Sequence, residues 1–99
     1  MLTGRDRRLL RTYVLEELIR LEDLVAVLDD AAGDAVGDQI ATMLREALAD
    51  LTTLRAMQRR IEESGFGECE HCREFIGVER LIALPDSIRC MRCTGRVER

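Results

Sequence analysis

The chain has 99 residues, of which 34% are charged, and a formal net charge of −4. With no Trp, one Tyr and two Phe it cannot build a large aromatic core, and a chain this short commonly needs a metal ion or disulfides to stabilise its fold. No run of about 18 apolar residues is present, which excludes a membrane-spanning helix. The N-terminus also lacks the apolar stretch of a secretory signal, so we expect a cytoplasmic protein.

Charge is distributed unevenly along the chain. Residues 16–50 hold ten acids and two arginines. Every basic residue of the protein is arginine, and the two ends are rich in them: Arg5, Arg7, Arg8, Arg11, Arg89, Arg92, Arg96 and Arg99. The sequence therefore has an acidic middle and two basic ends, although an ordinary solvated helix surface would show a similar imbalance.

A first helix is predicted over residues 4–29. Thr3 followed by Asp6 resembles a capping box in which Asp replaces the usual Glu, so the helix should begin near Gly4. Apolar residues then recur at helical steps of three and four, at Leu10, Val14, Leu18, Leu21, Val25 and Leu28. At about 1.5 Å per residue such a helix is roughly 39 Å long.

The segment 29–38 is predicted to be a turn, because it holds two glycines and four aspartates. Asp34 or Asp38 is expected to cap a second helix, which runs to about Ser64 and ends at Gly65. Its apolar positions alternate in steps of four and three, as in a coiled-coil seam. The seam comprises Ile40, Leu44, Ala47, Leu51, Leu54, Gln58 and Ile61, with one polar break at Gln58.

Two helices of matched length joined by a short loop are expected to fold back as an antiparallel hairpin. The fold class is then mainly α, with a coiled-coil hairpin at 1–64 followed by a small module at 65–99. The acidic segment 29–38 would form the free tip, and both basic ends would lie at the base. The alternative is that each apolar stripe packs against another protein. A two-helix hairpin is thin, so dimerisation stays open, but we expect a monomer.

All four cysteines lie in two Cys-x-x-Cys pairs separated by seventeen residues, namely Cys69, Cys72, Cys90 and Cys93. This spacing is typical of a four-cysteine zinc site. Four thiolates leave no open position for water or substrate, so the expected cofactor is one structural Zn²⁺. Two disulfides or a redox dithiol are the alternatives, and the missing secretory signal and βαβ pattern favour zinc. His71 is then expected to be an exposed spacer.

The linker between the two pairs is apolar over residues 75–88. A short helix or turn is expected at 79–84, before Pro85, and the segment should form a small apolar plug between the two metal-binding loops. Its apolar residues are Phe75, Ile76, Val78, Leu81, Ile82, Leu84 and Ile88. The six residues after Cys93 are too few to form a stable helix on their own.

The motif order Gly65-Phe66-Gly67-x-Cys69-x-x-Cys72, Ile76, Arg80-Leu81-x-Ala83-x-Pro85 and Cys90-x-x-Cys93 resembles the DksA/TraR-type zinc finger. The resemblance covers about residues 61–93. It implies a transcription regulator that binds bacterial RNA polymerase core, with the hairpin tip entering the secondary channel towards the catalytic magnesium. It also implies action on open complexes, often together with ppGpp, and no direct sequence-specific binding to promoter DNA.

Under this resemblance the partner-binding residues are expected at both ends of the hairpin. The tip would contribute Asp29, Asp30, Asp34 and Asp38, and the base would contribute Arg80, Arg89 and Arg92. Two departures from the family pattern stand out. Arg73 occupies a position where the family usually has Gly, and a left-handed backbone there would cost a non-Gly residue about 1 kcal/mol. The tip also lacks the family's Asp-x-x-Asp-x-Ala motif, so polymerase binding is better supported than the regulatory effect.

Other functions are less well supported. The alternative is a zinc-stabilised helical interaction module with a different protein partner, since fold does not fix function. Nucleic-acid binding by the arginines of the module is opposed by scarce aromatic residues and by four acids, at Glu68, Glu70, Glu74 and Glu79. With one histidine, and with the cysteines assigned to zinc, no nucleophile–base arrangement remains, so we do not expect an enzyme. Residues 30–41 also lack the closing Glu of a calcium loop.

Overall fold

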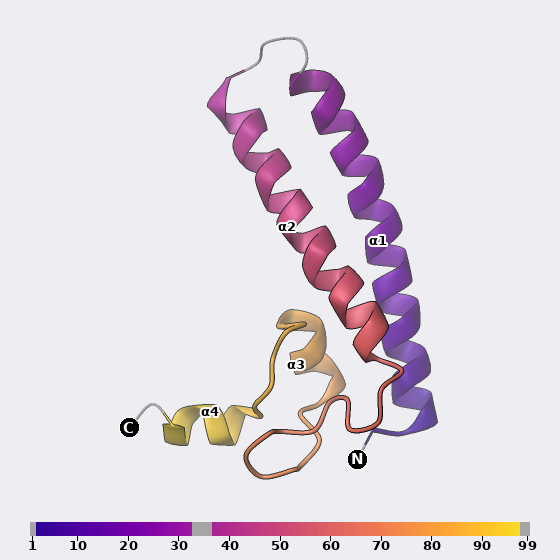
Figure 1. Ribbon diagram of the computed structural model, residues 1–99, viewed down its shortest axis with the longest axis vertical. Helices are drawn as coiled ribbons and strands as arrows, with labels where there is room; N and C mark the ends of the chain where they lie inside the picture. The colour runs from indigo at the N-terminus through magenta and orange to yellow at the C-terminus, as the bar shows by residue number, and fades with distance from the viewer. Residues whose placement is uncertain (1, 33–36, 98–99) are drawn as a thin grey trace.

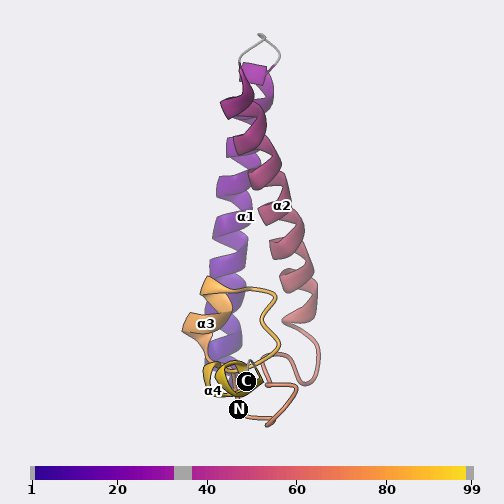
Figure 2. The same cartoon turned by 90° about the vertical axis from the view of Figure 1, so that its left-hand side faces the viewer.

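The computed structural model describes residues 2–32 and 37–97 and consists mainly of helices (Figure 1). Two long helices, α1 (Gly4–Ala32) and α2 (Asp38–Arg60), pack against each other in opposite directions. Two short helices, α3 (Val78–Ala83) and α4 (Met91–Val97), lie at the end of the hairpin that carries the N-terminus (Figures 1 and 2). The molecule measures 50 × 35 × 17 Å along its principal axes. The predicted antiparallel hairpin with a small C-terminal module is therefore confirmed.

The start of α1 is fixed by the predicted capping box. The backbone N–H of Asp6 donates to Thr3 Oγ1 at 3.0 Å, and the backbone N–H of Thr3 donates to Asp6 Oδ2 at 3.1 Å. These reciprocal bonds satisfy two of the donors that the first turn leaves without an intrahelical partner. At its other end α1 continues to Ala32, three residues beyond the predicted end. Residues 29–32 contain no helix breaker, and two of them are Ala, the strongest helix former.

The apolar stripes of α1 and α2 form the core of the hairpin, and the stripe of α1 agrees with the prediction except that Val25 is only partly buried. On α2 the predicted polar break was wrong, because Gln58 is exposed and Met57 is 0% exposed. Met57 lies one turn beyond Thr53, which faces a cavity shared with Ile82 and Pro85. Met57 therefore lies on the same face of α2 as Thr53 and belongs to the buried cluster of the molecule.

Both predicted boundaries of α2 needed correction. Its N-cap is Gly37, and Asp38 is the first helical residue, so Asp38 does not cap the helix. Asp34, the other expected cap, lies outside the described residues. The helix ends at Arg60 rather than near Ser64, and the chain then turns, with the N–H of Glu63 donating to the carbonyl of Arg60 at 2.9 Å. This earlier end lets the chain leave the helix axis and enter the C-terminal module.

The C-terminal module is joined to the hairpin through one continuous core. Phe66, Ile76 and Leu81 are buried in the same cluster as the stripes of α1 and α2. The predicted short helix before Pro85 is confirmed as α3, which packs against α1. Leu84 and Ile88 are exposed, so the predicted apolar plug is smaller than expected. Among the residues described, no helix is long and apolar enough to span a membrane.

Candidate metal centre

The first cysteine pair lies in a tight backbone loop. An isolated antiparallel bridge joins Glu68 to Phe75. Within it, the N–H of Cys69 donates to the carbonyl of Glu74 at 2.8 Å, and the N–H of Arg73 donates back to the carbonyl of Cys69 at 2.9 Å. The chain therefore reverses direction over a few residues, which brings the sulfurs of Cys69 and Cys72 into one cluster.

Two positions in this loop have left-handed backbone. Gly67 has φ +83°, and a Cβ there would lie 2.9 Å from a ring carbon of Phe75. Arg73 has φ +68° and is the non-glycine residue with positive φ in the described chain. The departure from the family's usual Gly therefore has a structural consequence, because an L-amino acid in this region carries a penalty of about 1–2 kcal/mol.

The second cysteine pair is held by a short helix. Cys90 immediately precedes α4, Cys93 lies in its first turn, and the N–H of Thr94 donates to the carbonyl of Cys90 at 3.0 Å. The six residues after Cys93 are by themselves too few to predict a stable helix. In the structure α4 begins at Met91 and includes the second ligand of the pair.

Hydrogen bonds and one ion pair tie the two cysteine loops together. The N–H of Glu70 donates to the carbonyl of Ile88 at 2.8 Å, and Arg89 Nε donates to Glu70 Oε1 at 2.8 Å. Arg80 contributes further, with Nε donating to the carbonyl of Arg89 at 3.0 Å and Nη2 donating to Thr94 Oγ1 at 3.1 Å. Arg80 and Arg89 therefore stabilise the arrangement of the two cysteine loops through bonds inside the module.

The four sulfurs are arranged as a four-cysteine metal site requires. All lie within 4.8 Å of one another, and the Cys72 and Cys90 Sγ atoms are 3.8 Å apart. A tetrahedral Zn²⁺ with Zn–S distances of about 2.3 Å places its sulfurs about 3.8 Å apart, so the cluster fits one zinc ion. Cys69 and Cys93 are fully buried, and His71 is exposed as expected. Four thiolates would close the coordination shell, which is the arrangement of a structural zinc.

The thiols of the cluster titrate very differently. Burial opposes ionisation of Cys69, but backbone hydrogen bonds from Cys72, Cys90 and His71 outweigh it and lower the pKa of Cys69 to about 6. Burial, together with the neighbouring sulfurs, raises the pKa of Cys93 to about 12. Cys69 therefore ionises readily, whereas burial first, and then hydrogen bonding and repulsion from the neighbouring sulfurs, oppose ionisation of Cys93. A divalent cation removes this repulsion, because it binds the thiolate form.

Comparison with known proteins agrees with this geometry. Residues 64–99 match the family model described as the prokaryotic dksA/traR C4-type zinc finger. No curated protein and no solved structure matches the chain. The last third of the chain is thus a C4 zinc finger of the DksA/TraR type, and the hairpin lies almost entirely outside the matched region.

Three of the four predicted tip residues, Asp29, Asp30 and Asp38, lie on the ends of α1 and α2 that are far from the four cysteines (Figure 1). Asp29 and Asp30 are exposed near the C-terminal end of α1, and Asp38 is exposed at the start of α2. Asp34 lies outside the described residues. Asp29 and Asp30 belong to the helix rather than to the predicted turn.

The predicted base residues lie around the metal centre but differ in availability. Arg80 and Arg89 are only partly exposed and make the internal bonds described above. Arg92 is exposed on α4, and the nearby Cys72 thiol raises its pKa. Of the three, Arg92 is the most accessible to a partner.

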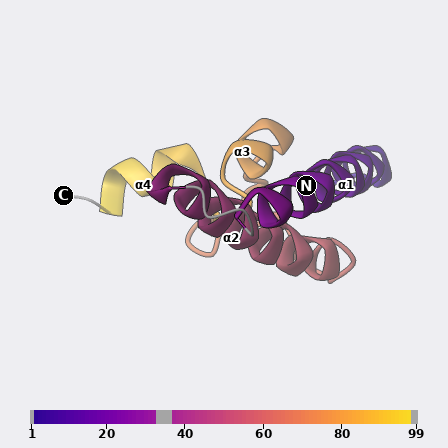
Figure 3. The same ribbon diagram turned by 90° about the horizontal axis from the view of Figure 1, so that it is seen from above.

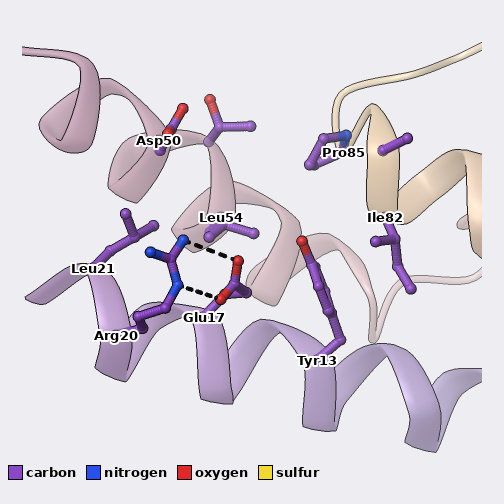
Figure 4. A pocket seen from close by; sticks show the side chains of 10 residues that line it. Tyr13, Glu17, Arg20, Leu21, Asp50, Leu54, Ile82 and Pro85 are labelled. Atoms are coloured by element: carbon purple, nitrogen blue, oxygen red, sulfur yellow. Dashed lines mark hydrogen bonds and ion pairs between the residues drawn. The ribbon is translucent and has the colours of Figure 1, made fainter. Parts of the chain in front are cut away.

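Sequence reasoning missed a cavity of about 210 Å³ between the hairpin and α3 (Figure 4). Its lining includes Tyr13, Glu17, Arg20 and Asp50, and Arg20 Nε donates to Glu17 Oε2 at 2.7 Å. That bond lowers the pKa of Glu17, while burial and then the charge of Glu17 raise the pKa of Tyr13. With two carboxylates and one paired guanidinium, the cavity disfavours an anionic ligand such as ppGpp. Its residues come from distant segments, so no local sequence signal could have found it.

Proposed function

We propose that the protein is a DksA/TraR-like transcription regulator that binds bacterial RNA polymerase core through the secondary channel, with the hairpin tip directed towards the active site. One observation carries this proposal: a zinc finger of this family lies at the base of an antiparallel hairpin whose far end presents exposed acids. At about 1.5 Å per residue, the 29 residues of α1 span roughly 44 Å. The hairpin would therefore hold its tip, inside the secondary channel, roughly this far from the zinc-finger base that docks on polymerase.

The tip would act by electrostatics. Asp29, Asp30 and Asp38 form no ion pair with any described residue, so their charge is available to a partner. Exposed carboxylates complement basic side chains or a metal ion at the end of a narrow channel. The protein would therefore modulate polymerase, in the cytoplasm and as a monomer, without a catalytic reaction of its own.

The decisive experiment combines competition for purified polymerase core with in vitro transcription. Wild-type protein should displace a known secondary-channel factor and should alter transcription. The triple variant Asp29→Asn, Asp30→Asn, Asp38→Asn should still compete for core, because the finger and the hairpin core are intact, but it should lose most of the transcriptional effect. Failure of the wild type to compete for core would overturn the proposal.

A matched control separates tip charge from total charge. The triple variant Glu22→Gln, Asp23→Asn, Glu46→Gln removes three exposed negative charges from the middle of the hairpin. It should behave like wild type in both assays. Equal loss of effect in the two triple variants would show that net charge, rather than the tip, is responsible.

A second candidate is a zinc-stabilised interaction module with another protein partner. It is favoured by the absence of the family's Asp-x-x-Asp-x-Ala motif at the tip. The discriminating result would be a purification that recovers another protein in stoichiometric amount and no polymerase subunit. Direct DNA binding is disfavoured, because Glu68, Glu70, Glu74 and Glu79 are exposed on the finger and oppose the phosphate neutralisation on which such binding depends.

A further inference from the structure

A groove of about 610 Å³ lies between α1 and α3 near the base of the hairpin. Figure 2 shows α3 lying against the lower half of α1, and Figure 3 shows the two from above. The apolar lining comes from two pairs of residues four apart in sequence, Leu9 with Tyr13 on α1 and Val78 with Ile82 on α3. Residues four apart lie on one face of a helix, so each pair forms a ridge and the groove runs between two ridges.

The groove carries positive charge that no acidic side chain of the described residues neutralises in an ion pair. Arg5 and Arg8 line it and are exposed, and neither forms an ion pair with a described residue. Arg11, one turn further on, differs, because its Nε donates to Glu62 Oε2 at 2.6 Å. Arginines in the first turns of a helix oppose its macrodipole, which favours acids there. Internal electrostatics therefore do not account for Arg5 and Arg8.

We propose that the α1–α3 groove docks an acidic amphipathic helix of a protein partner. The apolar face of that helix would lie between the ridges, and its carboxylates would meet Arg5 and Arg8. This is the helix-in-groove mode of recognition, in which anchors at i, i+3, i+4 and i+7 fill an apolar groove. Glu16, which also lines the groove, lies two turns or more beyond the arginines and gives the docked helix a preferred direction. The surface is separate from both the tip and the four cysteines.

Polymerase core is the first partner to test, and in that choice alone the inference rests on the proposed function. Leu9→Glu places a charge on the groove, and because Leu9 is 52% exposed, the fold should tolerate the change. We expect it to weaken competition for core about tenfold or more, as loss of a central interface anchor does. The double variant Arg5→Gln, Arg8→Gln should weaken binding about fivefold at low salt and less at high salt.

Matched controls exist on the two long helices, α1 and α2. Leu15 is 53% exposed on α1 and does not line the groove, so Leu15→Glu makes the same chemical change elsewhere. Arg55 and Arg59 are exposed on α2, and changing both to Gln removes the same charge. Both controls should bind core like wild type. Groove variants that also bind like wild type would overturn the inference while the proposed function stands.

If the wild type does not bind core, the proposed function fails and the groove is tested with a synthetic helical peptide that has a Leu face and a Glu face. Fluorescence anisotropy should show binding that Leu9→Glu abolishes and that a Lys counterpart of the peptide does not reproduce. Absence of binding would overturn the inference. The inference would also be overturned if the wild type sedimented as a dimer and Leu9→Glu dissociated that dimer. The groove would then bind a second copy of the chain.

Discussion

The two halves of the molecule obtain their stability in different ways. The shaft, formed by α1 and α2, buries a continuous apolar stripe along most of its length. The finger, residues 65–97, has two helices of 6 and 7 residues and few fully buried apolar side chains. It has instead a cluster of four sulfurs within 4.8 Å of one another. Isolated helices of that length do not persist in water, so the finger depends on the ion that its sulfurs bind.

This difference bears on how each half serves function. A stripe of apolar contacts distributes stability along the shaft, so substitutions at its solvent-facing residues and at its tip acids should leave the fold intact. In the finger, backbone hydrogen bonds and four cysteine ligands hold the two metal-binding loops together. The two halves share one core at the junction, where Ile61, Phe66 and Leu81 are buried together. Substitutions in the two halves should therefore change stability in different ways.

Loss of zinc should have the largest effect. Structural zinc sites in small modules have apparent binding free energies of roughly 10–16 kcal/mol, so Cys90→Ser or a strong chelator should unfold the finger. The shaft should keep most of its helical circular dichroism, because its stripe does not involve the sulfurs. Zinc content per chain and two-dimensional NMR of the finger amides would measure the change. His71→Ala, at an exposed position outside the sulfur cluster, should retain one zinc. Collapse of the whole spectrum would show that the shaft also needs the ion.

The second prediction concerns the buried stripe of α2. Met57→Ala removes a fully buried side chain and should lower the free energy of unfolding by about 2–5 kcal/mol. Its neighbour Gln58 is exposed, and Gln58→Ala should change stability by less than about 0.5 kcal/mol. Urea unfolding monitored by circular dichroism would measure both. A larger loss of stability for Gln58→Ala than for Met57→Ala would contradict the structure and support the regular coiled-coil seam that the sequence predicted.

A gain in stability is expected at Arg73. Because its φ is +68°, Arg73→Gly should stabilise the finger by about 1 kcal/mol or slightly more. Unfolding in the presence of zinc, or competition for zinc with a chelator, would detect the gain. Glu74→Gly is the matched control, since Glu74 has ordinary negative φ and should only lose stability. If Arg73→Gly weakens the finger, the side chain makes a contact that outweighs the strain.

The smallest expected effect is the pH dependence of the Arg11–Glu62 ion pair, which joins α1 to the turn that follows α2. The hydrogen bond from Arg11 lowers the pKa of Glu62 below its ordinary value. The unfolded chain therefore takes up the proton first as pH falls. The contribution of the pair is complete above the ordinary carboxyl pKa of about 4.3 and is lost as pH falls through the lowered value. Both side chains are about half exposed, so the effect should be slight.

Melting temperatures measured from pH 7 to pH 3 would test this, with Glu62→Gln compared to wild type. The melting temperature of Glu62→Gln should lack the small decrease at low pH that comes from losing the ion pair. Glu63→Gln, at the exposed neighbouring position, should keep that decrease. Over the same range the finger should release zinc, because its ligands bind as thiolates. Identical profiles for wild type and Glu62→Gln would mean that the pair adds no stability.

By itself the sequence determined the features that depend on near neighbours. Periodicity predicted both long helices, the Thr3–Asp6 pattern predicted the start of α1, and cysteine spacing predicted the metal site. These signals are local, because a helix face repeats every few residues and a Cys-x-x-Cys pair lies within one loop. The tertiary structure decided what depends on contacts between distant segments. It placed Met57 rather than Gln58 in the core, ended α2 at Arg60, and formed the cavity at Tyr13 and the α1–α3 groove. Each of these brings together side chains far apart in the chain, and one sequence carries no periodic or spacing signal for such contacts.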